Sequence, residues 1–114
     1  MNTIDTYRFG RIVINGHNYT SDVIIFPDRV QGEWWRDDSH RLALKDVAGI
    51  INENPEILLV GTGASGMMRV LPEVEQAAKA RNIKLIIQPT GEACQTYNQL
   101  SPTQRVAAAL HLTC

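Results

Sequence analysis

The chain has 114 residues, of which 44% are hydrophobic and 20% are charged, as is usual for a soluble globular protein. Its 11 basic and 12 acidic residues nearly cancel and form no Lys/Arg cluster, which excludes the basic footprint of a nucleic-acid-binding protein. No apolar stretch approaches the roughly 20 residues of a membrane-spanning helix. We therefore expect one domain over residues 1–114, with a hydrophobic core of its own.

The N-terminal residues and the cysteines predict the compartment. The first ten residues have neither the apolar core of a signal peptide nor the Arg/Ser bias of a transit peptide. The two cysteines, Cys94 and Cys114, fit a reducing compartment better than a disulfide scaffold. We expect a cytoplasmic protein.

The first third of the chain predicts a β-meander. Residues 9–15 are expected to form a strand, and Asn15-Gly16 then indicates a hairpin turn, because both residues tolerate positive φ. A second unbroken apolar run covers residues 23–26. Residues 29–36 are predicted as a further β segment that carries Trp34 and Trp35.

Further along, the apolar residues take helical spacing, and then a buried strand follows. Residues 39–54 are predicted as a helix that Pro55 ends. Residues 57–60 are apolar at every position, which is typical of a strand covered on both faces and usually parallel to its neighbours. This strand leads into a glycine-rich loop at residues 61–66.

The second half of the chain predicts one βαβ unit, a helix and a final strand. A helix is expected to begin at Pro72, because proline suits the first helical position, and the apolar strand Lys84–Gln88 follows it. Strands joined in this way are parallel, with a right-handed crossover. Thr90 is predicted to cap a helix that runs to about Leu100. The alanine content of residues 105–113 favours a helix, but their larger apolar residues alternate with other residues as in a strand. We interpret this segment as a buried strand.

The glycine-rich loop resembles a dinucleotide-binding turn only in part. Gly61, Gly63 and Gly66 fit the G-x-G-x-x-G pattern after a strand. That fingerprint requires a helix to begin inside the loop, whereas Pro72 places the helix start six residues beyond Gly66. A tight structural turn beside a small cleft is the better interpretation, with backbone N–H groups at residues 62–66 that could hold an anion.

No catalytic residue, metal or cofactor is predicted. Cys94 would lie near the start of a helix, whose dipole could lower the thiol pKa, and His111 could serve it as a base. Packing as a small apolar residue is the simpler role for this cysteine. His17, His40 and His111 are scattered without ligand spacing.

The aromatic and cationic residues Trp34, Trp35 and Arg36 are candidates for a surface that binds a protein partner. Adjacent residues of a strand face opposite sides, so at least one tryptophan would lie near the surface. The alternative is that one tryptophan packs inside while the other covers a sheet edge. Asp22 is expected to pair with Arg36 or with Arg105, either as a structural ion pair or in the lining of a cleft.

A series of motifs follows in order along nearly the whole chain. They are Gly16 and Tyr19 before Asp22-Val-Ile-Ile, Trp35-Arg36 with His40, Pro55-Glu56 before Leu-Leu-Val-Gly61-Thr62-Gly63, Thr90 with Ala93, Tyr97-Asn98-Gln99-Leu100, and the closing segment 105–114. This series resembles the Mth domain family, whose function is largely unknown. The family includes an adipogenesis-associated protein and a mitochondrial complex I assembly factor.

The resemblance implies a three-layer α/β domain with a mixed central sheet, whose final strand runs antiparallel to its neighbours. It also implies no established enzymatic activity or cofactor, and a mitochondrial relative that acts through protein partners. Two positions depart from the family. Asn82 stands where many relatives have glycine, and Gln88 stands where many have an acidic residue.

Two hypotheses for function follow. The first is a non-enzymatic interaction or assembly module that binds an unknown protein partner. Assembly of a respiratory complex is one process in which such a module would act. The alternative is an enzyme or a protein that binds a small ligand or anion in a cleft beside the glycine loop. The residues expected to line that cleft are Asp22, Arg36, Gly61, Thr62, Gly63, Ser65 and Arg105.

Overall fold

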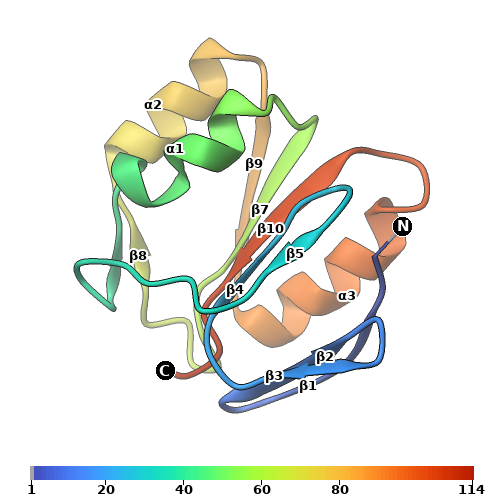
Figure 1. The fold of residues 1–114 in the computed structure, drawn as a ribbon. Coiled ribbons are helices and arrows are strands. Elements are labelled where there is room, and N and C mark those ends of the chain that lie inside the picture. The colour runs from blue at the N-terminus through green and yellow to red at the C-terminus, as the bar shows by residue number, and fades with distance from the viewer. Residues whose placement is uncertain (1) are drawn as a thin grey trace.

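A five-stranded mixed sheet forms the middle layer of the computed structural model, which describes residues 2–114 (Figure 1). The strands lie in the order β5-β4-β10-β7-β9. Their bounds are Val30–Gln31 for β5, Val23–Ile25 for β4, Val106–Leu110 for β10, Ile57–Gly61 for β7 and Lys84–Gln88 for β9.

The predicted central strand is buried on both faces. All five residues of β7 are buried, and β7 lies between β10 and β9. Leu58 and Val60 pack into the cluster on one face of the sheet, while Ile57 and Leu59 pack into the cluster on the other. An apolar side chain at every position is therefore required, as the sequence predicted.

The direction of the final strand differs in part from the expectation. Strand β10 runs antiparallel to β4 but parallel to β7, so the expected antiparallel arrangement holds for only one neighbour. The chain reaches β10 through the preceding helix. This helix returns the chain to the end of the sheet at which β7 and β9 also begin. A strand that follows such a crossover is parallel to the strands before it.

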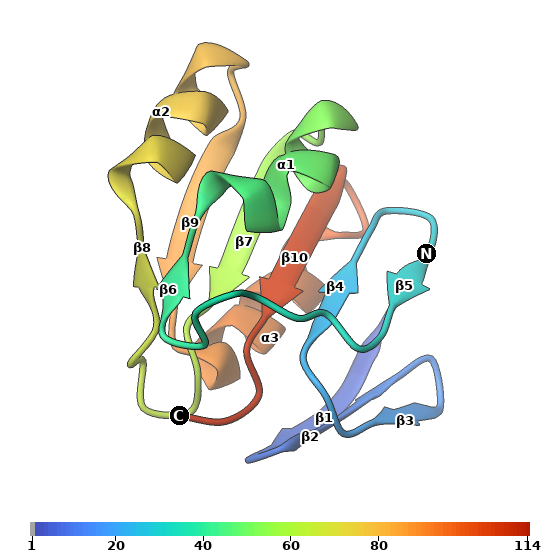
Figure 2. The same cartoon turned by 60° about the vertical axis from the view of Figure 1, so that its left-hand side comes forward.

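Helices α1 (Leu44–Asn52) and α2 (Pro72–Ala80) cover one face of this sheet (Figure 2). The chain enters them through β6 (Arg41–Leu42) and β8 (Arg69–Val70), which pair in parallel. The side chain of Glu73 accepts a hydrogen bond from the Leu44 N–H at 2.7 Å, so the first turn of α2 caps the start of α1.

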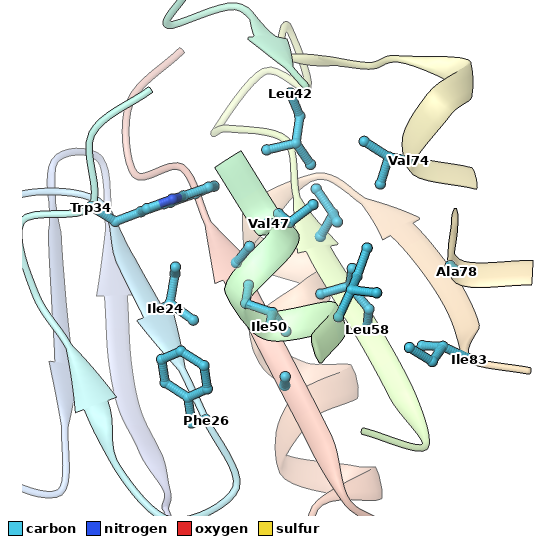
Figure 3. Packing of buried hydrophobic residues seen from close by; sticks show 14 of the residues in the cluster. Ile24, Phe26, Trp34, Leu42, Val47, Ile50, Leu58, Val74, Ala78 and Ile83 are labelled. Atoms are coloured by element: carbon cyan, nitrogen blue, oxygen red, sulfur yellow. The ribbon is translucent and has the colours of Figure 1, made fainter. Parts of the chain in front are cut away.

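Figure 3 shows the core between these helices and the sheet. Val47 and Ile50 of α1 point toward Leu58 of β7, and Val74 and Ala78 of α2 pack into the same cluster. These residues recur at three- and four-residue spacing in each helix, so each helix buries one stripe and exposes the other.

The third layer combines a helix with a small separate sheet. Helix α3 (Thr90–Leu100) packs on the opposite face of the main sheet, beside the antiparallel strands β1 (Ile4–Arg8), β2 (Arg11–Ile14) and β3 (His17–Tyr19). The Asn98 side chain accepts from the Ile4 N–H at 3.0 Å and donates to the Ile4 carbonyl at 2.8 Å. This pair of hydrogen bonds joins α3 to the small sheet.

Several predicted elements are confirmed. The Asn15-Gly16 turn has φ values of 53° and 78° and joins β2 to β3. Helix α2 begins at Pro72, β9 has the predicted bounds, α3 ends at Leu100 as predicted, and residues 106–110 form a strand. The strands of the expected meander are present as β2, β4 and β5, but they are divided between two sheets: β2 pairs with β3 and with β1, which the sequence analysis missed, and β4 pairs with β5 in the main sheet.

Three local predictions are wrong. The segment expected over residues 29–36 is a strand only at Val30–Gln31, because the chain turns at Glu33, where φ is 52°. The helix expected from residue 39 begins at Leu44, since the chain first pairs β6 with β8. Thr90 is the first helical residue rather than the cap, a position that Pro89 takes.

Candidate functional site

Three polar side chains from distant segments meet at the carboxyl end of β10. Val23 of β4 lies opposite Leu110 of β10, so the residue before β4 and the residue after β10 are also brought together. Asp22 Oδ2 lies 2.7 Å from His111 Nδ1 and 2.8 Å from Arg36 Nη1. We call Asp22, Arg36 and His111 the Asp22 cluster.

The Asp22 cluster is a buried and largely neutralised ion pair. The Arg36 side chain is 3% exposed and the Asp22 side chain 14% exposed. Burial alone would raise the pKa of Asp22, but hydrogen bonds from His111, the Leu112 N–H and Arg36 lower this pKa below its ordinary value. The carboxylate is therefore ionised at neutral pH and balances the charge of the guanidinium.

Within this cluster, His111 has a structural role. His111 Nδ1 lies 2.7 Å from Asp22 Oδ2 and 3.0 Å from Arg36 Nη2, so both contacts of this nitrogen lie within the cluster. The other ring nitrogen, Nε2, is sealed from solvent and has no hydrogen-bond partner among the described residues. An enclosed nitrogen of this kind cannot reach a substrate, so this geometry offers no general base.

The cluster fixes the loop that contains the two tryptophans. The Arg36 guanidinium lies over the Trp34 ring at 4.6 Å and donates through Nη2 to the Ser39 carbonyl at 3.1 Å. Trp34 is buried, and its indole N–H donates to the Asp46 carbonyl at 3.2 Å. Of the three residues predicted to form a partner surface, only Trp35 is exposed, at 73%.

A surface hollow of about 350 Å³ lies beside Trp35. Its apolar floor includes Ile24, Phe26 and Trp34, which Figure 3 shows side by side at the edge of the core. Its rim includes the charged residues Asp37 and Lys45, which form an ion pair with each other. We call this feature the Trp35 hollow.

At the glycine-rich loop, the chain's own closing segment occupies the inner side. Gly63 has φ of 108°, and a Cβ atom there would lie 2.6 Å from the backbone of Cys114. A Cβ atom on Gly61 would lie 2.8 Å from Leu110 and 2.9 Å from Thr90 Oγ1. Glycine is therefore needed at both positions so that other segments of the chain can pack closely.

Most of the N–H groups expected to hold an anion donate hydrogen bonds within the chain. The N–H of Thr62 donates to Gln88, and that of Gly63 donates to Thr90 Oγ1 at 2.8 Å. The N–H of Ala64 donates to the Thr113 carbonyl at 2.7 Å. These hydrogen bonds give the loop a structural role, since they tie it to β9, α3 and the closing segment.

The predicted cleft residues fall into separate places. Asp22 and Arg36 form the ion pair described above, and Ser65 is exposed in the glycine loop. Arg105 precedes β10, at the far end of that strand from His111, and donates to the carbonyls of Asn54 and Glu53. Of the two arginines predicted to pair with Asp22, the structure selects Arg36.

Burial decides the character of Cys94. The thiol packs between α3 and the small sheet, and its desolvation raises the pKa of Cys94 to about 12. The expectation of a thiol pKa lowered by the helix dipole is therefore wrong, and the interpretation as a packed small residue holds. Among residues 2–114, no group of three or more His, Cys, Asp or Glu side chains is placed to bind a metal ion.

Sequence reasoning missed the part that His111 has in the Asp22 cluster. The available signal was that His111 directly follows the final apolar run, while Asp22 directly precedes the apolar run at residues 23–26. Only the pairing of β4 with β10 turns that signal into a contact. Within the described part of the chain, no helix is long and apolar enough to cross a bilayer.

Together, the fold and the site define a three-layer α/β domain whose buried ion pair supports an exposed tryptophan. The model of a family described as a protein of unknown function (DUF498/DUF598) matches residues 4–111. The chain belongs to this family.

One similar protein is the NADH dehydrogenase (ubiquinone) 1 alpha subcomplex assembly factor 3 of Homo sapiens. It is 31% identical over 109 residues, which cover 93% of this chain and 58% of the relative. The chain thus spans little more than half the length of this relative.

Solved structures confirm the resemblance and the fold. A conserved hypothetical protein of Pyrococcus horikoshii superimposes with a TM-score of 0.90 at 30% identity, covering 98% of this chain and 99% of that chain. A Bordetella pertussis protein described as an Mth938-like domain gives a TM-score of 0.75 at 25% identity, covering 97% of this chain and 85% of that chain.

Proposed function

We propose that this protein is a non-enzymatic module that binds a protein partner during the assembly of a multi-subunit complex. Several of its relatives are named as assembly factors of NADH dehydrogenase, and the similarity to the human and rat proteins covers 93% of this chain. The candidate partner is accordingly a subunit or assembly intermediate of a respiratory NADH dehydrogenase. The observation that carries the proposal within the molecule is the exposed indole of Trp35 beside an apolar hollow.

The Trp35 hollow has the composition of an interface hot spot. Tryptophan and arginine dominate the binding energy of many interfaces, most often beside a pocket that excludes water. Trp35 supplies a large apolar surface at the rim, and the hollow can accept an apolar side chain of the partner. Asp37 and Lys45 would form the polar border of such a contact.

The loop that carries Trp35 is held in place before any partner binds. Arg36 is fixed by Asp22 on one side and by the Trp34 ring on the other. A rigid loop loses little conformational entropy on binding, which favours affinity. The Asp22 cluster thus supports the proposed surface without taking part in the contact.

Affinity capture from the native cell tests this proposal. The wild-type protein should repeatedly retain one partner, and Trp35→Ala should lose it. Phe9→Ala is the matched control, because Phe9 is also an exposed aromatic residue, 65% exposed, in a turn of the small sheet. A partner retained equally by wild type and Trp35→Ala would argue against this surface, and no partner above background would argue against the function.

The alternative function, a ligand site at the glycine loop, gains no specific observation in its favour. The N–H groups of Thr62, Gly63 and Ala64 already have partners within the chain. A thermal-shift screen with nucleotides and phosphorylated metabolites tests this alternative. The cytoplasmic location stays a prediction, which cell fractionation tests.

A further inference from the structure

Strand β9 forms an edge of the main sheet, where β7 is the one described strand that pairs with it. The Lys84 N–H donates to the Glu56 carbonyl at 3.0 Å, and the Gln88 carbonyl accepts from the Thr62 N–H at 2.9 Å. Residues 84, 86 and 88 therefore direct their backbone groups toward β7. The N–H and C=O groups of Leu85 and Ile87 point away from the sheet, where no strand of residues 2–114 pairs with them.

An apolar hollow of about 570 Å³ runs along this edge, between β9 and α2. Ala78, Ile83, Leu85 and Ile87 supply its apolar lining, and Ile87 is 41% exposed. Exposed sheet edges are usually shortened, charged or interrupted, because they otherwise pair with another chain. The opposite edge follows that rule, since β5 has two residues, whereas β9 has five.

The charges around this hollow are arranged so that the surface is complementary to itself. Glu75, near the start of α2, lies at one end, and Lys79, in the last turn of α2, lies at the other. Neither residue forms an ion pair with another described residue. A two-fold axis beside β9 and perpendicular to the sheet reverses the surface, so that the acidic end of one copy faces the basic end of the other.

We propose that β9 pairs antiparallel with β9 of a second copy of this chain, which joins the two main sheets into one. In the register that uses every free backbone group, Leu85 lies opposite the partner's Ile87, and Ile86 lies opposite the partner's Ile86. The two copies of Leu85 and Ile87 then form one apolar strip beside α2. Glu75 of each copy faces the partner's Lys79.

Sedimentation velocity of the purified full chain over a concentration series tests this proposal. We expect a dimer for wild type and a monomer for Ile87→Lys, which places two lysines within the apolar strip. Phe9→Lys makes the same kind of change on another exposed residue and should stay dimeric. Circular dichroism should show all three folded.

Exchanging the charges at the proposed interface provides a second, independent test of dimerisation, and it changes no buried residue. Glu75→Lys should raise the dimer dissociation constant about tenfold, because two attractive contacts become repulsive. Combining it with Lys79→Glu should restore the dimer. A monomeric wild type at every concentration, an Ile87→Lys dimer, or a dimer dissociated only by Phe9→Lys would each overturn the proposal.

Discussion

Asp22 and His111 are separated by 89 residues in the sequence, yet Oδ2 of one lies 2.7 Å from Nδ1 of the other. The contact joins the residue before β4 to the residue after β10 at the point where these antiparallel strands end. Arg36 completes the cluster and brings the tryptophan loop to the same place. The stability of the fold and the position of Trp35 therefore depend on one carboxylate.

Replacing Asp22 with Asn should destabilise the protein by about 3 kcal/mol, because it leaves the buried guanidinium of Arg36 without a counter-charge. Equilibrium unfolding in urea at neutral pH measures this change. Asp28→Asn is the matched control, since Asp28 pairs with Arg29 on an exposed surface. Equal effects of the two substitutions would contradict the structural role of the Asp22 cluster.

The contribution of Asp22 should also depend on pH in a defined direction. Because hydrogen bonds lower its pKa in the folded state, the ionised carboxylate stabilises the folded protein above the ordinary carboxyl pKa of 3.8. This stabilisation is lost as the pH falls through the lower pKa of the folded state. Unfolding free energies of wild type and Asp22→Asn should therefore converge below about pH 4. A difference that stays constant under acid conditions would be inconsistent with a lowered pKa.

Gly63→Ala should destabilise the protein by about 3 kcal/mol, since it adds a Cβ atom 2.6 Å from the Cys114 backbone at a position with φ of 108°. Gly49→Ala is the opposite case. Gly49 lies within α1 with no atom within 4 Å of the added carbon, so alanine should stabilise the protein by about 1 kcal/mol. Thermal unfolding of the two variants measures both, and a neutral Gly63→Ala would mean that the loop is not packed as described.

Cys94 should resist alkylation in the folded protein at neutral pH, because burial raises the pKa of its thiol to about 12 and blocks access. Cys114 is exposed and should react readily with iodoacetamide. Mass spectrometry of the digested protein assigns the modified residue. Comparable rates at the two cysteines under native conditions would show that Cys94 is accessible.

The main elements could be predicted from the sequence because local patterns determine them. Pro72 marks the start of α2, and an unbroken apolar run marks β7. The alternation of residues 106–110 indicated a strand in spite of their alanines. Each of these signals lies within a few residues of the element that it specifies.

Features that depend on distant segments could not be predicted. The inner side of Gly63 is filled by residues 113 and 114, which lie some fifty positions further along the chain. The burial of Arg36 depends on the pairing of β4 with β10, and the exposure of Trp35 depends on the turn at Glu33. Sequence alone gave Arg36 and Arg105 as alternative partners of Asp22 and could not decide between them.

The most direct test of the proposed function is a titration of the captured partner against the purified protein by calorimetry. Loss of an indole at the centre of an interface typically costs at least 2 kcal/mol, so the dissociation constant of Trp35→Ala should rise about thirtyfold or more. Phe9→Ala should bind as wild type does. An unchanged dissociation constant for Trp35→Ala would contradict the role assigned to the Trp35 hollow.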